Sequence, residues 1–99
     1  AYWLNAYNVF TLHAILAETY AKEPFVHVLP FGQLPHTRHV RGSNMTFIGL
    51  AADRIPGRMI IGSALDNLVK GAAGQAIENM NLMLGFAETL GIDQPPMFP

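Results

Sequence analysis

The chain has 99 residues, of which 51% are hydrophobic and 13% are charged, a composition that suits one folded domain and excludes a disordered segment. Its formal net charge of −1 provides no basic field for nucleic acid, and no apolar run approaches the roughly 20 residues needed to cross a membrane. It contains no cysteine, which excludes a disulfide framework and favours a reducing compartment.

Residues 2–21 are predicted to form the first helix. Apolar and aromatic side chains recur on two of its faces, so we expect other parts of the protein to surround it almost completely. Pro24 ends the helix, because the residue before a proline avoids helical dihedrals. Since this patterned segment opens the chain at Ala1, without an initiator methionine, we expect the chain to be part of a longer protein.

The middle of the chain is predicted to form a sheet of three or four strands. Residues 25–29 alternate between two prolines and form a short strand, and a second strand is expected from Arg38. The clearest strands are 45–52 and 57–65, joined by the turn sequence "DRIPG" into a hairpin. Together with helices at both ends, this order predicts an α+β fold with a mostly antiparallel sheet.

The last helix is predicted over about 69–84, with Gly85 as its left-handed C-terminal residue and Asp66 as its N-terminal cap. The proline-rich tail cannot continue it. Its apolar residues fall on one face of the helix: Leu68, Val69, Ala72, Ala73, Ala76, Ile77, Met80 and Leu84.

Gly71 and Gly74 are unexpected at the start of this helix, because each glycine costs about 1 kcal/mol relative to alanine. Small residues here would let another backbone or a flat ligand approach closely. The helix amides would then favour an anionic group, with the charge of Lys70 nearby. Close packing of the helix on the sheet is the alternative, and spacing alone slightly favours it.

Two arginines are candidates for ligand binding. Arg38 and Arg41 could hold a carboxylate or phosphate through bidentate hydrogen bonds. A surface ion pair with Asp53 or Glu23 is the alternative, and we give it more weight.

The histidines and serines identify no catalytic residue and no metal site. His36 and His39 have a spacing that suits a metal on a helix, but they lie in a predicted loop and lack a third ligand. Ser43 and Ser63 lack a nucleophile motif.

The runs "PHTRHVRGSN" and "DRIPGRMIIGSALDNLVKGAAGQAIENMNLMLGFAETLG" resemble the carboxyl-terminal end of the N-acetyl-gamma-glutamyl-phosphate reductase family. The resemblance covers about residues 17–91, whereas residues 1–16 do not follow the run usual in that family. The most specific part, "DNLVKGAAGQA", is similar to runs in aspartate-semialdehyde dehydrogenases, so a fragment of such an enzyme is an alternative.

The resemblance implies a two-domain enzyme of arginine biosynthesis, with an NADP-binding Rossmann domain and an α+β domain for catalysis and dimerisation. Residues 1–65 would belong to the α+β domain, and 66–99 would hold the helix that returns to the NADP-binding domain. The anion that Arg38 and Arg41 could hold would then be the acyl-phosphate substrate. The residues implied to lie against the nicotinamide end of NADP are Asn67, Lys70, Gly71, Ala72 and Gly74.

In that family a cysteine thiolate attacks the acyl phosphate, and hydride from NADPH reduces the resulting thioester. Because this chain has neither a cysteine nor a glycine-rich nucleotide turn, we expect residues 1–99 to be inactive alone. A non-catalytic module that self-associates through its sheet is the alternative from another class. The resemblance implies a location in the cytoplasm or in an organelle, with no membrane or nucleic-acid partner.

Overall fold

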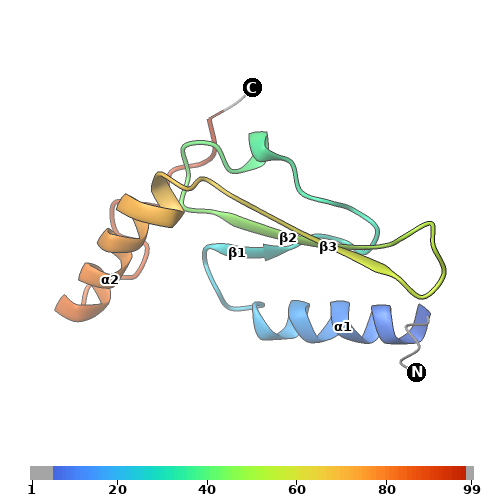
Figure 1. Cartoon of the computed structure of the whole chain (residues 1–99). Helices are drawn as coiled ribbons and strands as arrows, with labels where there is room; N and C mark the ends of the chain where they lie inside the picture. Colours follow the sequence, from blue (N-terminus) through green and yellow to red (C-terminus); the bar gives the residue numbers. More distant parts are fainter. Residues whose placement is uncertain (1–5, 98–99) are drawn as a thin grey trace. The chain divides into compact units, whose positions relative to one another are not determined.

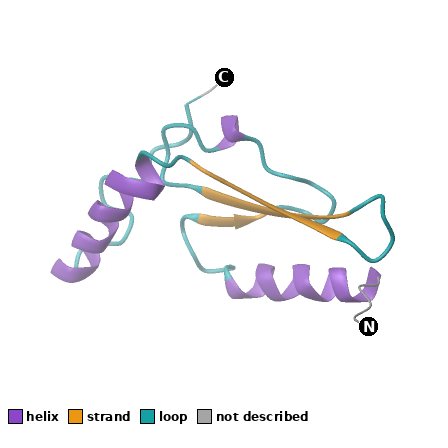
Figure 2. Cartoon of the chain, in the orientation of Figure 1, coloured by secondary structure: helices purple, strands orange, loops and turns teal. Residues whose placement is uncertain are grey.

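The computed structural model describes residues 6–97. The elements follow in the order α1 (Ala6–Thr19), β1 (Val26–Val28), η1 (Thr37–His39), β2 (Thr46–Ala52), β3 (Met59–Leu65), η2 (Val69–Ala73) and α2 (Gly74–Leu84), as Figure 1 shows. The strands form one sheet in the order β1-β2-β3 (Figure 2). The predicted α+β class is confirmed. Two compact units divide the chain, the first comprising Ala1–Pro35 and Phe47–Ser63 and the second His36–Thr46 and Ala64–Pro99.

The first unit contains α1, which lies along the sheet (Figure 1). His13 fastens the helix, because its Nε2 lies 2.7 Å from the carbonyl oxygen of Leu29, just beyond β1. The buried apolar residues of this unit are Val9, Phe25 and Leu50. The helix predicted over residues 2–21 is confirmed for α1, and residues 2–5 lie outside the described range.

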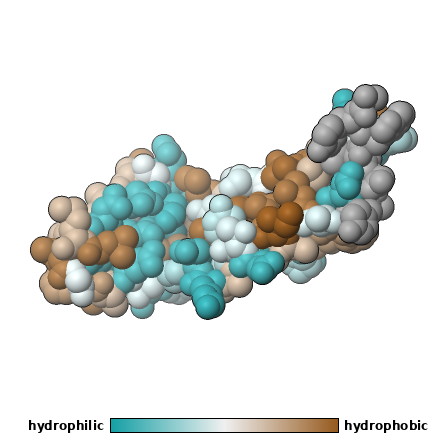
Figure 3. Space-filling model, turned by 90° about the horizontal axis from the view of Figure 1, so that it is seen from below, coloured by the Kyte–Doolittle hydropathy of each residue, from teal (hydrophilic) through white to brown (hydrophobic). Residues whose placement is uncertain are grey.

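The expectation that other parts of the protein surround α1 is wrong for this chain. Phe10 and Ile15 are 55% and 53% exposed. Figure 3 shows apolar surface over α1 and, in the second unit, over the end of α2. Part of the apolar surface of α1 is therefore left open by the described residues.

The β2–β3 hairpin matches the strands predicted over 45–52 and 57–65. Asp53 stabilises its turn, since its carboxylate accepts hydrogen bonds from the Arg54 amide and the Arg58 side chain, both at 2.7 Å. The sheet as a whole is mixed. Bonds from the Leu29 amide to the Ile48 carbonyl and from the Gly32 amide to the Leu50 carbonyl advance in the same direction along both segments, as in a parallel pair.

The strand predicted from Arg38 is wrong, because the chain forms the 3-10 helix η1 there. The His39 amide donates to the carbonyl of His36 at 3.0 Å, and the Val40 amide donates to that of Thr37 at 3.2 Å. These local bonds use the backbone groups that a strand would offer to a neighbour. Gly42, at φ +72°, then turns the chain.

The predicted helix over 69–84 is confirmed in extent, but it opens as the π-helical turn η2. The Gly71 amide donates to the carbonyl of Asp66 and the Ala73 amide to that of Leu68, at 3.3 and 3.1 Å, which is the five-residue spacing of a π-helix. Gly85 ends α2 at φ +73°, so the left-handed C-terminal residue is also confirmed.

Contrary to the amphipathic pattern, α2 buries a polar face. Its buried residues are Gly74, Glu78 and Asn81, which lie on one side of the helix. The predicted apolar face is open, with Leu68 78% exposed and Leu84 61% exposed. Asn81 donates from Nδ2 to the carbonyls of Glu88 and Leu90 at 3.1 and 3.0 Å, so it anchors the following loop. The buried apolar residues of this second unit are Val40, Ala64 and Ile92.

Candidate functional site

Each unit contains a cavity large enough to hold a small group. The cavity of the first unit, about 220 Å³, is lined by Ala17, Tyr20, Ala21, Val26, His27 and Val28. The cavity of the second unit, about 230 Å³, is lined by Thr37, Val40, Arg41, Leu65, Asp66 and Asn67. The second combines a guanidinium, a carboxylate, an amide and a hydroxyl group, and we call it the Arg41–Asn67 cavity.

Two predicted ligand-binding residues meet at this cavity. Arg41, predicted from its guanidinium, precedes the glycine turn, whereas Asn67, implied by the family resemblance, precedes η2. Arg38 does not line the cavity. Of the acidic partners proposed for the two arginines, Asp53 pairs with Arg58 at 2.7 Å inside the hairpin.

Asp66 bridges the two segments that form the cavity. Its Oδ2 accepts a hydrogen bond from the Gly42 amide at 2.7 Å, and its Oδ1 accepts one from the Leu68 amide at 2.9 Å. These two amides lower the pKa of Asp66 below its ordinary value of 3.8, and the positive charge of Arg41 adds to the effect while burial opposes it. The N-terminal cap is Leu68 rather than the predicted Asp66, whose carboxylate binds the amide of that cap residue.

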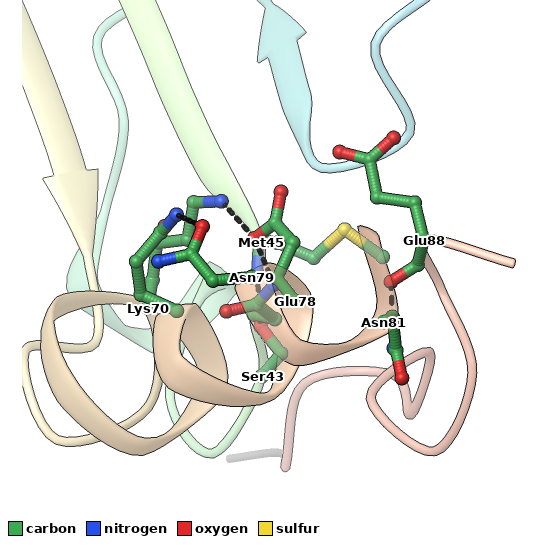
Figure 4. Close-up of polar contacts among 9 residues, drawn as sticks. Ser43, Met45, Lys70, Glu78, Asn79, Asn81 and Glu88 are labelled. Atoms are coloured by element: carbon green, nitrogen blue, oxygen red, sulfur yellow. Dashed lines mark hydrogen bonds and ion pairs between the residues drawn. The ribbon is translucent and has the colours of Figure 1, made fainter. Parts of the chain in front are cut away.

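Lys70 belongs to a separate, largely buried cluster (Figure 4). Its Nζ lies 2.7 Å from Oε2 of Glu78, which also accepts a hydrogen bond from Nδ2 of Asn44 at 3.1 Å. The Lys70 and Glu78 side chains are only 16% and 9% exposed. Burial acts to raise the pKa of Glu78, but hydrogen bonds from Lys70 and Asn44 hold it below its ordinary value. The ammonium implied to contact NADP thus neutralises a buried carboxylate.

The two glycines leave room for side chains of the same unit. A Cβ on Gly74 would collide with Oδ1 of Asn44 and stand 2.7 Å from the carbonyl oxygen of Val69. A Cβ on Gly71 would collide with Oδ1 of Asn67, whose side chain is exposed. Each glycine therefore leaves room for an asparagine side chain, and no strand residue is among the atoms nearest to either added Cβ. Asn44 itself is fully buried, and no donor among the described residues reaches its Oδ1.

Sequence reasoning missed the polar residues that organise this unit. Ser43 is buried, donates from Oγ to the Val40 carbonyl at 2.8 Å and accepts from the Met45 amide at 3.3 Å, so it fixes the turn before β2. Asn44 and Glu78 were not identified because each looks like an ordinary turn or helix-surface residue. The only signal concerned Glu78, because Lys70 is a cation eight residues earlier on the same helical segment.

The histidine pair shows a ring contact rather than a ligand set. The rings of His36 and His39 meet edge to face, with centroids 5.4 Å apart. Among residues 6–97, no cluster of three or more histidine, aspartate or glutamate side chains is placed to hold a metal ion. Within the same range, no helix is long and apolar enough to span a bilayer.

Comparison with known proteins places these features in a family. The model of the "semialdehyde dehydrogenase, dimerisation domain" family matches residues 4–67. The N-acetyl-gamma-glutamyl-phosphate reductase of Afipia carboxidovorans is 70% identical over 86 residues, covering 87% of this chain and 24% of the relative. The reductase of the same name from Rhodospirillum rubrum is 63% identical over 89 residues, which cover 90% of this chain and 25% of the relative. The reductase of Geobacter metallireducens is 59% identical over 92 residues, which cover 93% of this chain and 27% of the relative.

The family match begins earlier than the sequence resemblance indicated. It starts at residue 4, so it includes most of residues 1–16, the segment that does not follow the run usual in the reductase family. The chain spans about a quarter of the length of these relatives. With the family model matching residues 4–67, the chain belongs to the semialdehyde dehydrogenase dimerisation domain family.

Proposed function

We propose that the chain is part of an N-acetyl-gamma-glutamyl-phosphate reductase, which reduces an acyl phosphate to the semialdehyde with NADPH during arginine biosynthesis. The observation that carries this proposal is the 70% identity over 86 residues to a reductase of that name. In this proposal residues 1–65 form part of the catalytic and dimerisation domain. Residues 66–99 supply the helix that returns to the NADP-binding domain.

The Arg41–Asn67 cavity is the proposed contact with substrate. A guanidinium matches the planar, multidentate geometry of phosphate or carboxylate oxygens. The hydroxyl of Thr37 and the amide of Asn67 add donors around the same space. Arg38, outside the cavity, is assigned the weaker role of attracting the anionic substrate.

The residues implied to contact NADP fit that role unequally. Asn67 lines the cavity, and Ala72 is exposed, so both can face a flat ring. Lys70 is engaged with Glu78, and Gly71 and Gly74 accommodate asparagine side chains of this chain. We therefore centre the proposed nicotinamide contact on Asn67. The thiol nucleophile and the nucleotide-binding turn are assigned to the remaining three quarters of the relatives' length.

Self-association through the sheet is the second part of the proposal. The family is described as a dimerisation domain, and in the first unit apolar side chains lie exposed on both the helix and the hairpin. Ile60 and Ile61 of β3 are 42% and 55% exposed. A second copy that covers such residues would gain about 25 cal/mol for each Å² of apolar surface removed from water. A non-catalytic module would keep this self-association without any reductase activity.

A chimeric enzyme distinguishes the reductase proposal from the non-catalytic interaction module. In the Afipia carboxidovorans reductase, the matching segment would be replaced by this chain, and NADPH oxidation dependent on N-acetylglutamyl phosphate would be measured. We expect a turnover within about tenfold of the unmodified reductase, because 70% of the exchanged residues are identical. A chimera that is folded and dimeric but inactive would contradict the reductase proposal and favour the interaction module.

A further inference from the structure

We propose that Asp66 is a positioning residue, whose carboxylate sets the orientation of Arg41 and Asn67 toward the cavity they share. This inference rests on the proposed function, because it assigns Asp66 a part in binding the substrate and cofactor of that reaction. Asp66 acts through the two neighbouring side chains and makes no contact with the reacting atoms.

The argument begins with the peptide units that the carboxylate holds. The Gly42 amide nitrogen is bonded to the carbonyl carbon of Arg41, and the Leu68 amide nitrogen is bonded to that of Asn67. Because a peptide unit is planar, fixing its N–H direction also fixes the ψ dihedral of the residue before it. The bonds of 2.7 and 2.9 Å to Asp66 therefore constrain the backbone that carries each cavity side chain.

The Arg41 side is held at both ends of one peptide unit. In the peptide unit between Arg41 and Gly42, the Gly42 N–H donates to Asp66, and the Arg41 carbonyl oxygen accepts a hydrogen bond from the Met97 amide at 2.8 Å. The next carbonyl, that of Gly42, accepts from Nε2 of Gln94 at 3.2 Å. Without the Asp66 carboxylate, only the Met97 amide would hold the Arg41–Gly42 peptide unit. Rotation of that unit would change the direction in which the Arg41 side chain leaves the backbone.

The Asn67 side is held by the carboxylate and by the start of the helix. The main-chain carbonyl of Asp66 accepts from the amides of Val69 and Gly71 at 3.2 and 3.3 Å. Asn67 lies between these anchored groups, and its side chain occupies the space that a Cβ on Gly71 would fill. The same aspartate thus orients one segment through its side chain and the other through both its side chain and its backbone.

Electrostatics argue against a direct contact between Asp66 and the ligand. A carboxylate facing a cavity for an acyl phosphate would repel it unless its charge were compensated. Both Asp66 oxygens accept backbone amides, and the charge of Arg41 further stabilises the ionised form. A positioning role explains why an acidic residue is compatible with an anionic ligand here.

The test uses the chimeric reductase described above, with Asp66→Asn as the principal variant. Asparagine keeps the shape but replaces one acceptor oxygen with an NH2 group, so one amide is lost as a partner. We expect KM for both N-acetylglutamyl phosphate and NADPH to rise, with kcat/KM falling on the order of tenfold. Asp53→Asn removes a carboxylate from the hairpin turn and serves as the matched control, with kcat/KM within about twofold.

Non-additivity distinguishes positioning from a general structural effect. If Asp66 acts through Arg41, Asp66→Asn will change KM for the acyl phosphate by less than about threefold once Arg41→Ala is present. In the corresponding double-mutant cycle, Asp66→Asn will change KM for NADPH by less than about threefold once Asn67→Ala is present. Fully multiplicative effects in both cycles, or an unchanged kcat/KM in the single variant, would overturn the proposal.

An inactive chimera before any substitution would contradict the proposed function instead. In that case, the positioning role of Asp66 is tested by NMR on the 99-residue chain. There, Asp66→Asn is expected to shift the Gly42 and Leu68 amides together with the side-chain resonances of Arg41 and Asn67. If the two amides move and the two side chains do not, the proposed positioning is wrong.

Discussion

Replacing Gly74 by alanine tests the packing at the start of α2. Alanine is the better helix former by about 1 kcal/mol, so helix propensity alone predicts stabilisation. The added Cβ, however, would collide with Oδ1 of the buried Asn44 and stand 2.7 Å from the Val69 carbonyl oxygen and 2.9 Å from Val69 Cγ1. Overpacking a close-packed site typically costs about 1–3 kcal/mol. After the gain in propensity is subtracted, we expect Gly74→Ala to lower the unfolding free energy by up to about 2 kcal/mol.

Gly71→Ala is the matched control three residues away. Its Cβ would meet only the side chain of Asn67, which is exposed and can rotate away. We therefore expect this variant to lie within about 0.5 kcal/mol of the parent or to be stabilised by up to about 1 kcal/mol. Urea unfolding followed by circular dichroism compares the two, with equal slopes required before the midpoints are interpreted. If Gly74→Ala proves as stable as Gly71→Ala, the close contact with Asn44 does not govern this glycine.

Three further predictions concern polar groups. The pKa of Glu78 is lowered in the folded chain, so the ionised carboxylate stabilises the fold above its ordinary pKa of 4.5, and this stabilisation is lost as pH falls through the folded pKa. Glu78→Gln should therefore remove that part of the decline in unfolding free energy at acid pH. A pH profile of unfolding free energy that the substitution leaves unchanged would refute this prediction. Asn81→Ala removes both hydrogen bonds that anchor the following loop, so we expect a loss of about 2–3 kcal/mol in urea unfolding, and less than 0.5 kcal/mol would show that the loop holds without them. Arg58→Ala breaks an exposed ion pair with Asp53 and should change the unfolding free energy by less than about 1 kcal/mol, with a larger loss indicating that the pair organises the hairpin.

The hairpin and the end of α2 could be predicted because short stretches of sequence determine them. The hairpin follows from two β-branched runs around "DRIPG", and the end of α2 follows from a glycine that adopts a left-handed conformation. The strand predicted from Arg38 was wrong because the local bonds of η1 use its backbone groups, and the turn that follows η1 is held by distant partners. Met97 binds the Arg41 carbonyl and Asp66 binds the Gly42 amide, and neither contact is visible in the nearby sequence.

The inward face of α2 could not be predicted from hydropathy. Periodicity assigns the apolar side of a helix to the core, but Glu78 is buried because Lys70 and Asn44 supply its partners. The candidate site was predictable only in part, for a related reason. Arg41 and Asn67 were each identified singly, whereas their meeting at one cavity depends on tertiary structure. Asp66 was expected to cap a helix, and its bond to the Gly42 amide, 24 residues away, was not foreseen.

The most direct test of the reductase account is the KM for N-acetylglutamyl phosphate in the chimera, measured for Arg41→Ala and Arg38→Ala. Arg41 lines the cavity and Arg38 does not, although both were candidates from sequence. We predict that Arg41→Ala raises this KM at least tenfold, by loss of a charged hydrogen-bond donor, whereas Arg38→Ala changes it less than about threefold. Equal effects of the two substitutions, or no effect of Arg41→Ala, would contradict the assignment of the Arg41–Asn67 cavity to the substrate.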